Sequence, residues 1–357
     1  MSVKMVQKFT LWATVILITV CAFESCSKNK QDPPDFQYGA EVDVYVAGAE
    51  QTTAGKWVAK YWKNGTPVEL SDGVNNAEAT SVFVLGEDVY VAGQETDNTT
   101  SIAKYWKNGA EVALTDGTER AEVHSIFVEG QTVYVAGALR DDLGRSRAVY
   151  WKNGTPFTLS SSSGMGMATA IAAAHGNVYV AGYEEEGTKG WKAKVWENDI
   201  ATQLSSTNSY ADALFLDGND VYVSGSEDEP NGDRIGKVWK NGHELYRLNE
   251  EYDFGLTYSL FVEQGEVYVA GSERSAQKIY AAKVWHNGKG RKLNPEAEDS
   301  NTFARAVAAH NGEIYVVNVL APKFEFEGEV RLWKNGQYEK LTDKGKGNAV
   351  FVVEKRK

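Results

Sequence analysis

The sequence predicts an all-β fold: a seven-bladed β-propeller with four antiparallel strands in each blade. Three observations lead to this prediction, namely a repeat of 43–47 residues, a regular set of hairpin turns, and two chain ends that complement each other. Repeats of this length with four short strand signals are typical of propeller blades. Residues 40–357 show no helical periodicity, so we expect no helices to cover the sheets.

A tyrosine in a Val/Ile-Tyr-Val context and a later tryptophan mark every repeat. The tyrosines are Tyr45, Tyr90, Tyr134, Tyr179, Tyr222, Tyr268 and Tyr315, and the tryptophans are Trp62, Trp106, Trp151, Trp196, Trp239, Trp285 and Trp333. In the second repeat the strand signals cover 81–84, 88–93, 103–106 and a short run ending near Leu114. These runs are rich in β-branched and aromatic residues and bounded by Gly, Asn and Asp. We interpret the recurring aromatic residues as packing between blades and not as a ligand cage.

The turns repeat as regularly as the strands. The tetrapeptide Trp-Lys-Asn-Gly occurs at 62–65, 106–109, 151–154, 239–242 and 333–336. Asn-Gly supplies the two positive-φ residues of a type I′ turn. We therefore expect the third and fourth strands of each repeat to form a tight hairpin.

The two ends of the repeat region complement each other. The first repeat begins at its second strand, 42–48, and the missing first strand is matched by 348–352, which resembles 80–84. We expect the C-terminal strand to complete the first blade and close the ring, which removes two exposed sheet edges. A solenoid, the alternative architecture, would need polar caps in place of this exchange.

The repeat is similar to those of kelch and other seven-bladed propellers, in which a strand ending in glycine precedes a Tyr/Trp strand. An Ala-Gly pair, at 92–93 and 136–137, stands where kelch repeats have Gly-Gly. The Gly-His and Trp-Asp pairs of WD repeats are missing. The resemblance implies an architecture and no particular function.

The N-terminus has the features of an export signal. Lys4 and Lys8 precede an apolar run at 9–23, and Ser25 and Cys26 follow. The pattern resembles a bacterial lipoprotein signal with the loose cleavage motif of Bacteroidota, which implies cleavage before Cys26 and lipidation of its thiol. An ordinary secretory signal or an uncleaved anchor is the alternative.

This resemblance sets the expected domain organisation and location. We expect a signal peptide at 1–25, a polar linker at 26–39 and the propeller at 40–357. The protein would be held in the cell envelope by a lipid anchor, most simply on the outer membrane, facing the periplasm or the cell surface. Because Cys21 and Cys26 are the only cysteines, the propeller has no disulfide and depends on packing for its stability.

The charge and the scarcity of histidine limit the function classes. The net charge is −12, and it becomes −13 without residues 1–25, which argues against nucleic acid as a partner. The five histidines show no metal-binding spacing, and we interpret the acidic runs at 184–186 and 227–229 as solvated charges. We expect a monomer without cofactor, metal or assigned catalytic residue.

Candidate binding residues come from the positions at which the repeats disagree. Long, diverse loops fall on one face of the predicted propeller, where a rigid scaffold can present them. The residue that precedes a small Ser or Ala in each first strand also varies, and we expect these seven residues to line an axial funnel: Thr80, His124, Thr169, Asp212, Tyr258, Arg305 and Asn348. A solvated strand end without selected chemistry is the alternative.

The sequence thus favours a binding module that captures a protein or glycan ligand on the variable-loop face. The alternative is a glycan-acting hydrolase or lyase with its site at the axial funnel. A third hypothesis is a scaffold subunit of an envelope complex.

Overall fold

The computed structural model describes residues 41–355, apart from 98, 161–164, 250–253, 294–298 and 324. The chain divides into two units, Met1–Asp35 and Phe36–Lys357, and the description concerns the second. The predicted signal peptide, the polar linker and the lipidation site at Cys26 lie outside the described residues. No helix among the described residues is long and apolar enough to span a membrane.

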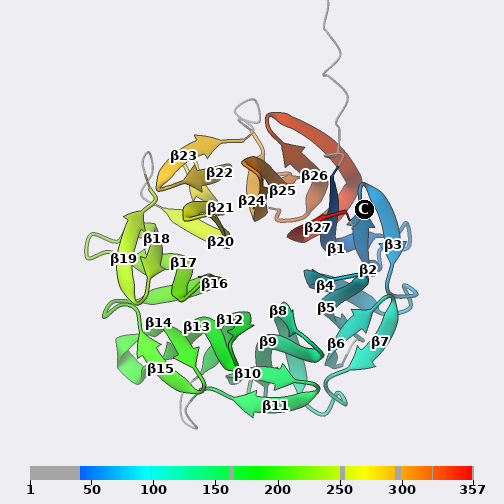
Figure 1. Ribbon diagram of the computed structural model, residues 1–357, viewed down its shortest axis with the longest axis horizontal. Coiled ribbons are helices and arrows are strands. Elements are labelled where there is room, and N and C mark those ends of the chain that lie inside the picture. The colour runs from blue at the N-terminus through cyan, green and yellow to red at the C-terminus, as the bar shows by residue number, and fades with distance from the viewer. Residues whose placement is uncertain are drawn as a thin grey trace, which may run out of the picture. The chain divides into compact units, whose positions relative to one another are not determined.

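Four strand positions recur along the chain (Figure 1). The innermost strands are β4 (Asn76–Leu85), β8 (Arg120–Glu129), β12 (Gly166–Ala174), β16 (Ser209–Asp217), β20 (Gly255–Glu263) and β24 (Asn301–His310). The second strands are β1 (Val42–Gln51), β5 (Asp88–Thr96), β9 (Thr132–Arg140), β13 (Asn177–Glu185), β17 (Asp220–Asp228), β21 (Glu266–Arg274) and β25 (Glu313–Ala321).

The third strands are β2 (Trp57–Lys63), β6 (Ser101–Lys107), β10 (Ser146–Lys152), β14 (Trp191–Glu197), β18 (Arg234–Lys240), β22 (Tyr280–His286) and β26 (Gly328–Lys334). The outer strands are β3 (Thr66–Glu69), β7 (Ala110–Ala113), β11 (Thr155–Thr158), β15 (Ile200–Gln203), β19 (His243–Arg247) and β23 (Lys289–Lys292). The last strand, β27 (Gln337–Glu354), has two roles, and a short 3₁₀ helix, η1 (Gly187–Lys189), precedes β14.

All the strands pair in antiparallel fashion, and the sheets surround a common centre (Figure 1). Each innermost strand contacts the innermost strand of the next sheet, from β27 to β4, then β8, β12, β16, β20 and β24, and back to β27. Twisted four-stranded sheets arranged in this way define the β-propeller fold that the repeat predicted.

The number of separate sheets differs from the expected seven. Five sheets have four strands, and a sixth has seven strands in the order β24-β25-β26-β27-β1-β2-β3. The first part of β27 pairs with β26 and its last part pairs with β1, with Val350 opposite Val46 and Val352 opposite Val44. The connection between these parts is the shortest of the repeats and stays extended, so the two sheets merge. The expected pairing of 348–352 with 42–48 is present.

The recurring aromatic residues are packing residues, as predicted. All seven tryptophans of the repeat are at most 7% exposed, and six of the seven tyrosines are buried. Trp106 packs with the buried core between the first and second repeats, and Trp151 with the core between the second and third. Burial of such large side chains stabilises the contact between neighbouring sheets.

The predicted hairpin turns are also present. In the turns between third and fourth strands, the asparagine has φ of 47–51° and the following glycine is also at positive φ in six of seven, while Asp199 at 71° replaces it in the other. The asparagine has a second role that the sequence did not indicate. The side chain of Asn108, for example, accepts a hydrogen bond from Val89 N at 2.9 Å, so each turn is fastened to the start of its second strand.

Five repeats contain an ion pair between the second and third strands that the sequence analysis missed. The pairs are Glu50–Lys60, Glu95–Lys104, Glu184–Lys194, Glu227–Lys237 and Glu273–Lys283, with N–O distances of 2.5–2.8 Å. The third repeat has Leu139 and Val149 at these positions, both buried. The same scaffold therefore accommodates either an ion pair or an apolar pair, as expected when desolvation offsets much of the Coulomb attraction.

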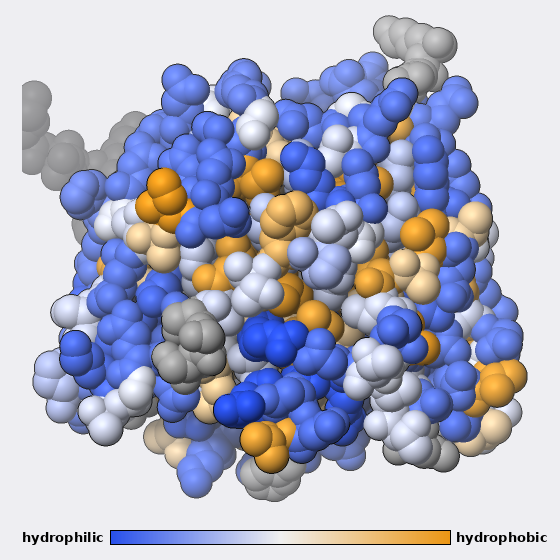
Figure 2. Space-filling view, turned by 90° about the horizontal axis from the view of Figure 1, so that it is seen from below, coloured by the Kyte–Doolittle hydropathy of each residue, from blue (hydrophilic) through white to orange (hydrophobic). Residues whose placement is uncertain are grey.

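The outer rim of the propeller is a solvated surface. Figure 2 shows one side of the molecule, on which hydrophilic residues predominate and hydrophobic residues form small, separate patches. Leu143 and Ile200, both more than 70% exposed, are the most exposed large hydrophobic residues of the described chain. Isolated residues of this kind are common on soluble proteins and need no partner.

Candidate functional site

The seven predicted site residues share one backbone feature. Each is the extra residue of a β-bulge in an innermost strand, because the register with the second strand shifts across Thr80, His124, Thr169, Asp212, Tyr258, Arg305 and Asn348. A bulged residue has no partner in the ladder, and bulges redirect side chains beside functional sites. The residues lie within the strands, so they are not the solvated strand ends that were the alternative to an axial funnel.

The bulge explains the glycine that ends the Ala-Gly pair of the repeat. A Cβ on Gly93 would lie 2.0 Å from the carbonyl oxygen of Glu78, and one on Gly137 would lie 1.9 Å from that of Glu122. The bulge brings this carbonyl close to the second strand, and the residue opposite it is glycine in six repeats and Asn318 in the seventh. The pair Ala-Gly is therefore the sequence signal of the bulge.

Side chains from the bulges reach neighbouring sheets and hold the ring together. Thr257, next to the bulged Tyr258, donates a hydrogen bond to Asp212 Oδ2 at 2.8 Å, and Thr169 donates to the carbonyl of Ala211 at 2.8 Å. Asn348 Nδ2 donates to Glu78 Oε1 at 2.8 Å. These contacts therefore connect β27 to β4, β12 to β16, and β16 to β20.

The small residues that follow the bulges also join the sheets. Ser81 Oγ accepts a hydrogen bond from Ile126 N at 3.2 Å, and Ser259 Oγ accepts one from Val307 N at the same distance. We expected these serines only to fit a crowded interior. The hydroxyl thus adds a hydrogen bond that alanine at the same position cannot make.

Asp212 is the one carboxyl among the seven ring residues, and its pKa is shifted. The surrounding protein desolvates it and raises its pKa from the usual 3.8 to about 7, although Thr257 and the charge of Arg234 act in the opposite direction. An acid with such a pKa exchanges its proton near neutral pH. The sequence indicated the position of Asp212 but could not indicate this property.

Two other ring residues have pKa values shifted in the direction that favours the neutral side chain. Burial lowers the pKa of His124, against the attraction of Glu122 and Glu78, so the imidazole is neutral. Its Nε2 lies 3.1 Å from Met167 Sδ. Burial also raises the pKa of Tyr258, against the effect of the Arg305 charge, so its phenol remains protonated.

Arginines and aromatic rings form a cluster on the sheets from β16 to β26, which we call the arginine–aromatic cluster. Its members are Tyr210, Arg234, Phe254, Tyr258, Arg274, Tyr280, Phe303, Arg305 and Phe326. The guanidinium of Arg274 lies 3.9 Å from the ring centre of Phe254, and that of Arg305 lies 4.8 Å and 4.9 Å from those of Tyr258 and Phe303. Stacking of this kind fixes the plane of a guanidinium.

The arginines of the cluster differ in whether they have an anionic partner. Arg234 forms an ion pair with Asp228, with 2.6 Å between Nε and Oδ1. Arg274 and Arg305 make no ion pair with any residue the structure describes, and their contacts are with aromatic rings. Unpaired guanidinium groups on an acidic protein are suited to bind anions.

Some aromatic residues in or beside the loops between strands belong to the same region. Phe254 and Phe326 are members of the cluster, while Trp191 packs edge-on against Tyr183. Tyr252 and Phe324 lie outside the described residues. The loops therefore supply rings to the arginines of the strands.

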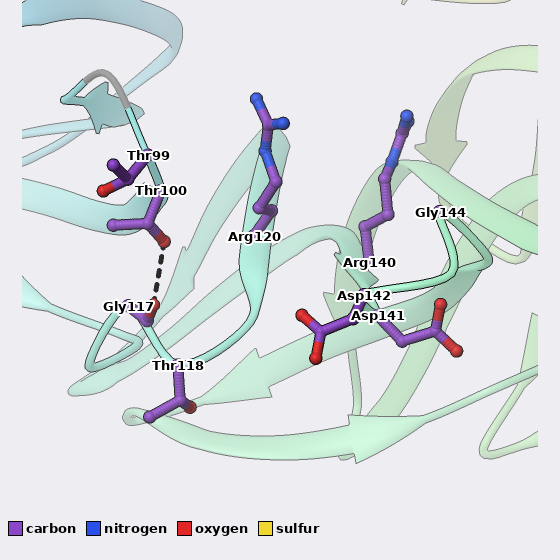
Figure 3. A pocket seen from close by; sticks show the side chains of 9 residues that line it. All are labelled: Thr99, Thr100, Gly117, Thr118, Arg120, Arg140, Asp141, Asp142 and Gly144. Carbon is purple, nitrogen blue, oxygen red and sulfur yellow. Dashed lines mark hydrogen bonds between the residues drawn. The ribbon is translucent and has the colours of Figure 1, made fainter.

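Away from the ring and the cluster, a hollow lies on the loop side of β8 and β9. It has a volume of about 560 Å³ and is lined by threonines, arginines and aspartates (Figure 3). Arg120 and Arg140 extend in the same direction, and Thr100 donates a hydrogen bond to the carbonyl of Gly117 at 2.8 Å. Arg140 is paired with Glu122 at 2.7 Å. This hollow is open and lined by exposed loops, so it is a weaker candidate than the ring.

Comparisons with known proteins concern the fold. No protein-family model matches the chain, and no curated protein matches it either. Among solved structures, the chain is similar to a puromycin-hydrolyzing peptidase of Mycobacterium tuberculosis, with a TM-score of 0.54 and 12% identity over 86% of this chain and 52% of that one. The chain thus spans about half the length of that peptidase.

Two further similar structures are the β-propeller domain of the Trilobed protease from Pyrococcus furiosus and TolB from Acinetobacter baumannii. The TM-scores are 0.49 and 0.43, with 13% and 9% identity; 86% and 85% of this chain is covered, and 96% and 63% of theirs. Identities this low show likeness of fold and not of activity. The chain is a β-propeller protein by the arrangement of its own sheets, and the ring and the cluster are its candidate functional sites.

Proposed function

We propose that this protein is a cell-envelope lipoprotein whose propeller captures a protein or glycan ligand on the side of the variable loops. The observation that carries the proposal is the ring itself. Seven equivalent bulges present six different side chains, with threonine occurring twice, while the packing residues of the same repeats are nearly invariant. A rigid scaffold with variable polar groups at one level is the usual organisation of a binding site.

The proposed ligand enters where the arginine–aromatic cluster meets the ring. Arg305 belongs to both, and its guanidinium is held in place by rings and has no anionic partner in the described chain. Preorganised groups bind with a smaller entropic cost than mobile ones. The net charge of −12 supports a binding partner other than nucleic acid.

A glycan array, followed by titration of the purified protein with each positive glycan, tests this function. We expect a limited set of ligands, with weaker binding after Arg305→Ala and unchanged binding after Arg247→Ala on the outer strand β19. Stable co-purification with one envelope protein, in the absence of glycan binding, would favour the scaffold hypothesis. Unchanged binding after substitution at every ring residue would contradict a site at the ring.

We also propose that Cys26 carries the lipid anchor. The proposal is supported by the apolar run at 9–23 and by the absence of any cysteine beyond Cys26. Cys26→Ala should move the protein from the membrane fraction to the soluble fraction of the producing cell. Unchanged membrane association would contradict lipidation at this residue.

We further propose that the propeller has seven blades, with β27 serving two of them. The support is the pairing of its first part with β26 and of its last part with β1, which gives each half of the seven-stranded sheet four strands. Removal of residues 347–357 should then expose an edge of β1 and prevent stable folding. A truncated protein that unfolds at the same temperature as the full chain would contradict this closure.

Asp212 supports a second candidate function, a glycan-acting hydrolase or lyase. A carboxyl with a pKa of about 7 among the polar side chains of the ring has the property of a general acid. In an enzyme, Asp212→Asn would abolish turnover of a bound glycan and retain its binding. If bound glycans remain chemically unchanged over long incubation, the enzymatic function is excluded and only the binding function is retained.

A further inference from the structure

A small cavity lies between the ring and the cluster. Its volume is about 200 Å³, which is comparable to one sugar ring or one amino-acid residue. Its lining comes from β4, β24, β25, β27 and the loop before β26: Glu78, Val319, Arg305, Phe326, Glu327, Lys346, Gly347 and Asn348. Four of the side chains are acidic or basic groups, namely Glu78, Arg305, Glu327 and Lys346, and they come from segments far apart in the sequence, so folding alone creates this site.

The two basic groups of the cavity, Lys346 and Arg305, differ in whether they have an anionic partner. Lys346 Nζ lies 2.9 Å from Glu78 Oε2 and 3.4 Å from Glu327 Oε1, so this lysine is engaged by two carboxylates. These two ion pairs raise the pKa of Lys346 despite the opposing effect of burial. Arg305 has no such partner among the residues that the structure describes. The cavity therefore contains one cation that is available to a ligand and is already oriented by the rings of Tyr258 and Phe303.

The remaining groups are hydrogen-bond acceptors and apolar surface. Asn348 uses its amide hydrogens on Glu78 Oε1 and on the carbonyl of Ala79, so its amide oxygen is left to accept. Glu327 is about half exposed and has one oxygen beyond its ion pair. Phe326 is 56% exposed and supplies an apolar wall with Val319. Acceptors of this kind pair with hydroxyl donors, and an aromatic wall suits the C–H face of a sugar ring.

This combination discriminates between anionic ligands. A phosphate dianion would meet a single unpaired cation and two nearby carboxylates, so repulsion opposes it. A glutamate-rich peptide has carboxylates for Arg305 but no hydroxyl donors for Asn348 and Glu327. A uronic acid has one carboxylate and several hydroxyls on a ring of suitable size.

We infer that this cavity binds a uronic acid residue of an acidic glycan, with the sugar carboxylate on Arg305 and its hydroxyls on Asn348 and Glu327. The inference rests on the proposed binding function and names the substrate class for it. The guanidinium donates two parallel N–H···O hydrogen bonds to a carboxylate, which gives both affinity and orientation. Because the surrounding groups are nearly neutral in sum, the site takes a single negative charge per sugar.

Calorimetric titration of the purified full chain with trigalacturonic acid tests the inference, with maltotriose as the neutral sugar and pentaglutamate as the acidic peptide. We expect binding of trigalacturonic acid only, weakened several-fold when the salt concentration rises from 50 to 500 mM. Arg305→Met should weaken it at least tenfold, and Arg305→Lys should weaken it less because the charge remains. Arg247→Met, a substitution of a half-exposed arginine on β19, serves as the matched control and should not change the affinity.

Thermal unfolding of each variant separates loss of binding from loss of fold. Equal binding of maltotriose, or unchanged affinity after Arg305→Met in a folded protein, would overturn the inference and leave the general binding function intact. If pentaglutamate binds and trigalacturonic acid does not, the ligand is an acidic peptide and not a uronic acid, and the inference is overturned as well. If a glycan array and a search for envelope partners are also negative, the proposed function itself falls.

Discussion

Substitution of Asp212 by asparagine should make the protein more stable at alkaline pH. Asp212 lies at a bulge of β16, and burial raises its pKa from 3.8 to about 7. Asparagine has nearly the same shape, and its amide oxygen can accept the hydrogen bond that Thr257 donates to Asp212. The substitution therefore removes the charge with little change in packing.

The sign and size of the effect follow from proton linkage. Between about pH 4 and pH 7 the folded protein retains a proton on Asp212 that the unfolded chain releases, so the stability of the native protein falls as the pH rises. Each pH unit corresponds to 1.36 kcal/mol, which sets an upper limit of about 4 kcal/mol at pH 8. Asp212 is only half-buried, and water access reduces the expected gain of Asp212→Asn to about 2 kcal/mol.

Urea unfolding at pH 4.5, 6, 7 and 8 measures this effect. The difference in the free energy of unfolding between the native protein and Asp212→Asn should be smallest at pH 4.5 and should grow as the pH rises toward 7. Asp299→Asn, at an exposed position, is the control and should give a difference that does not depend on pH. A difference for Asp212→Asn that is the same at every pH, or that shrinks toward pH 8, would refute the reasoning.

Two further predictions concern the scaffold, and urea unfolding checks both. Gly93→Ala should lower the free energy of unfolding by about 3 kcal/mol, because its Cβ would lie 2.0 Å from the Glu78 carbonyl oxygen. Gly109→Ala, at positive φ in open space, is the control and should lower it by about 1 kcal/mol. Equal losses of stability would contradict the role of the bulge. Lys283→Val should lower the free energy of unfolding by about 3–5 kcal/mol, because Glu273 stays buried without its ion-pair partner Lys283. Adding Glu273→Leu should bring the free energy of unfolding back to within about 1 kcal/mol of the native value. A double variant as unstable as the single one would contradict the comparison with the third repeat.

The sequence predicted the scaffold well because the repeat averages out local ambiguity. The aromatic pairs, the Asn-Gly turns and the exchange of the C-terminal strand could each be aligned several times within one chain. The merged sheet of β27 was missed, since strand continuity depends on how the short connection near Gly345 and Gly347 packs against Val330. The ion pair Glu95–Lys104 was missed because its two members lie on different strands and only the pairing register brings them together.

The candidate site was predicted in part for the same reason. Comparison of repeats found the seven variable positions, including Asp212 and Arg305, without any knowledge of the bulges. It did not find Glu78 and Lys346, two residues before a bulged position, or the arginine–aromatic cluster. Those residues do not recur at equivalent positions of the repeats. They come into contact only because particular loops and strands lie side by side in the folded protein.

What the sequence by itself determined is the repeating unit: four strands, their turns, the packing residues and the positions at which the units differ. These properties are local, because strand alternation and turn chemistry act over a few residues. The tertiary structure decided the rest, including the proton affinity of Asp212, the unpaired state of Arg305 and the cavity beside it. Desolvation and Coulomb interactions depend on distances between sheets, and only the closed ring sets those distances.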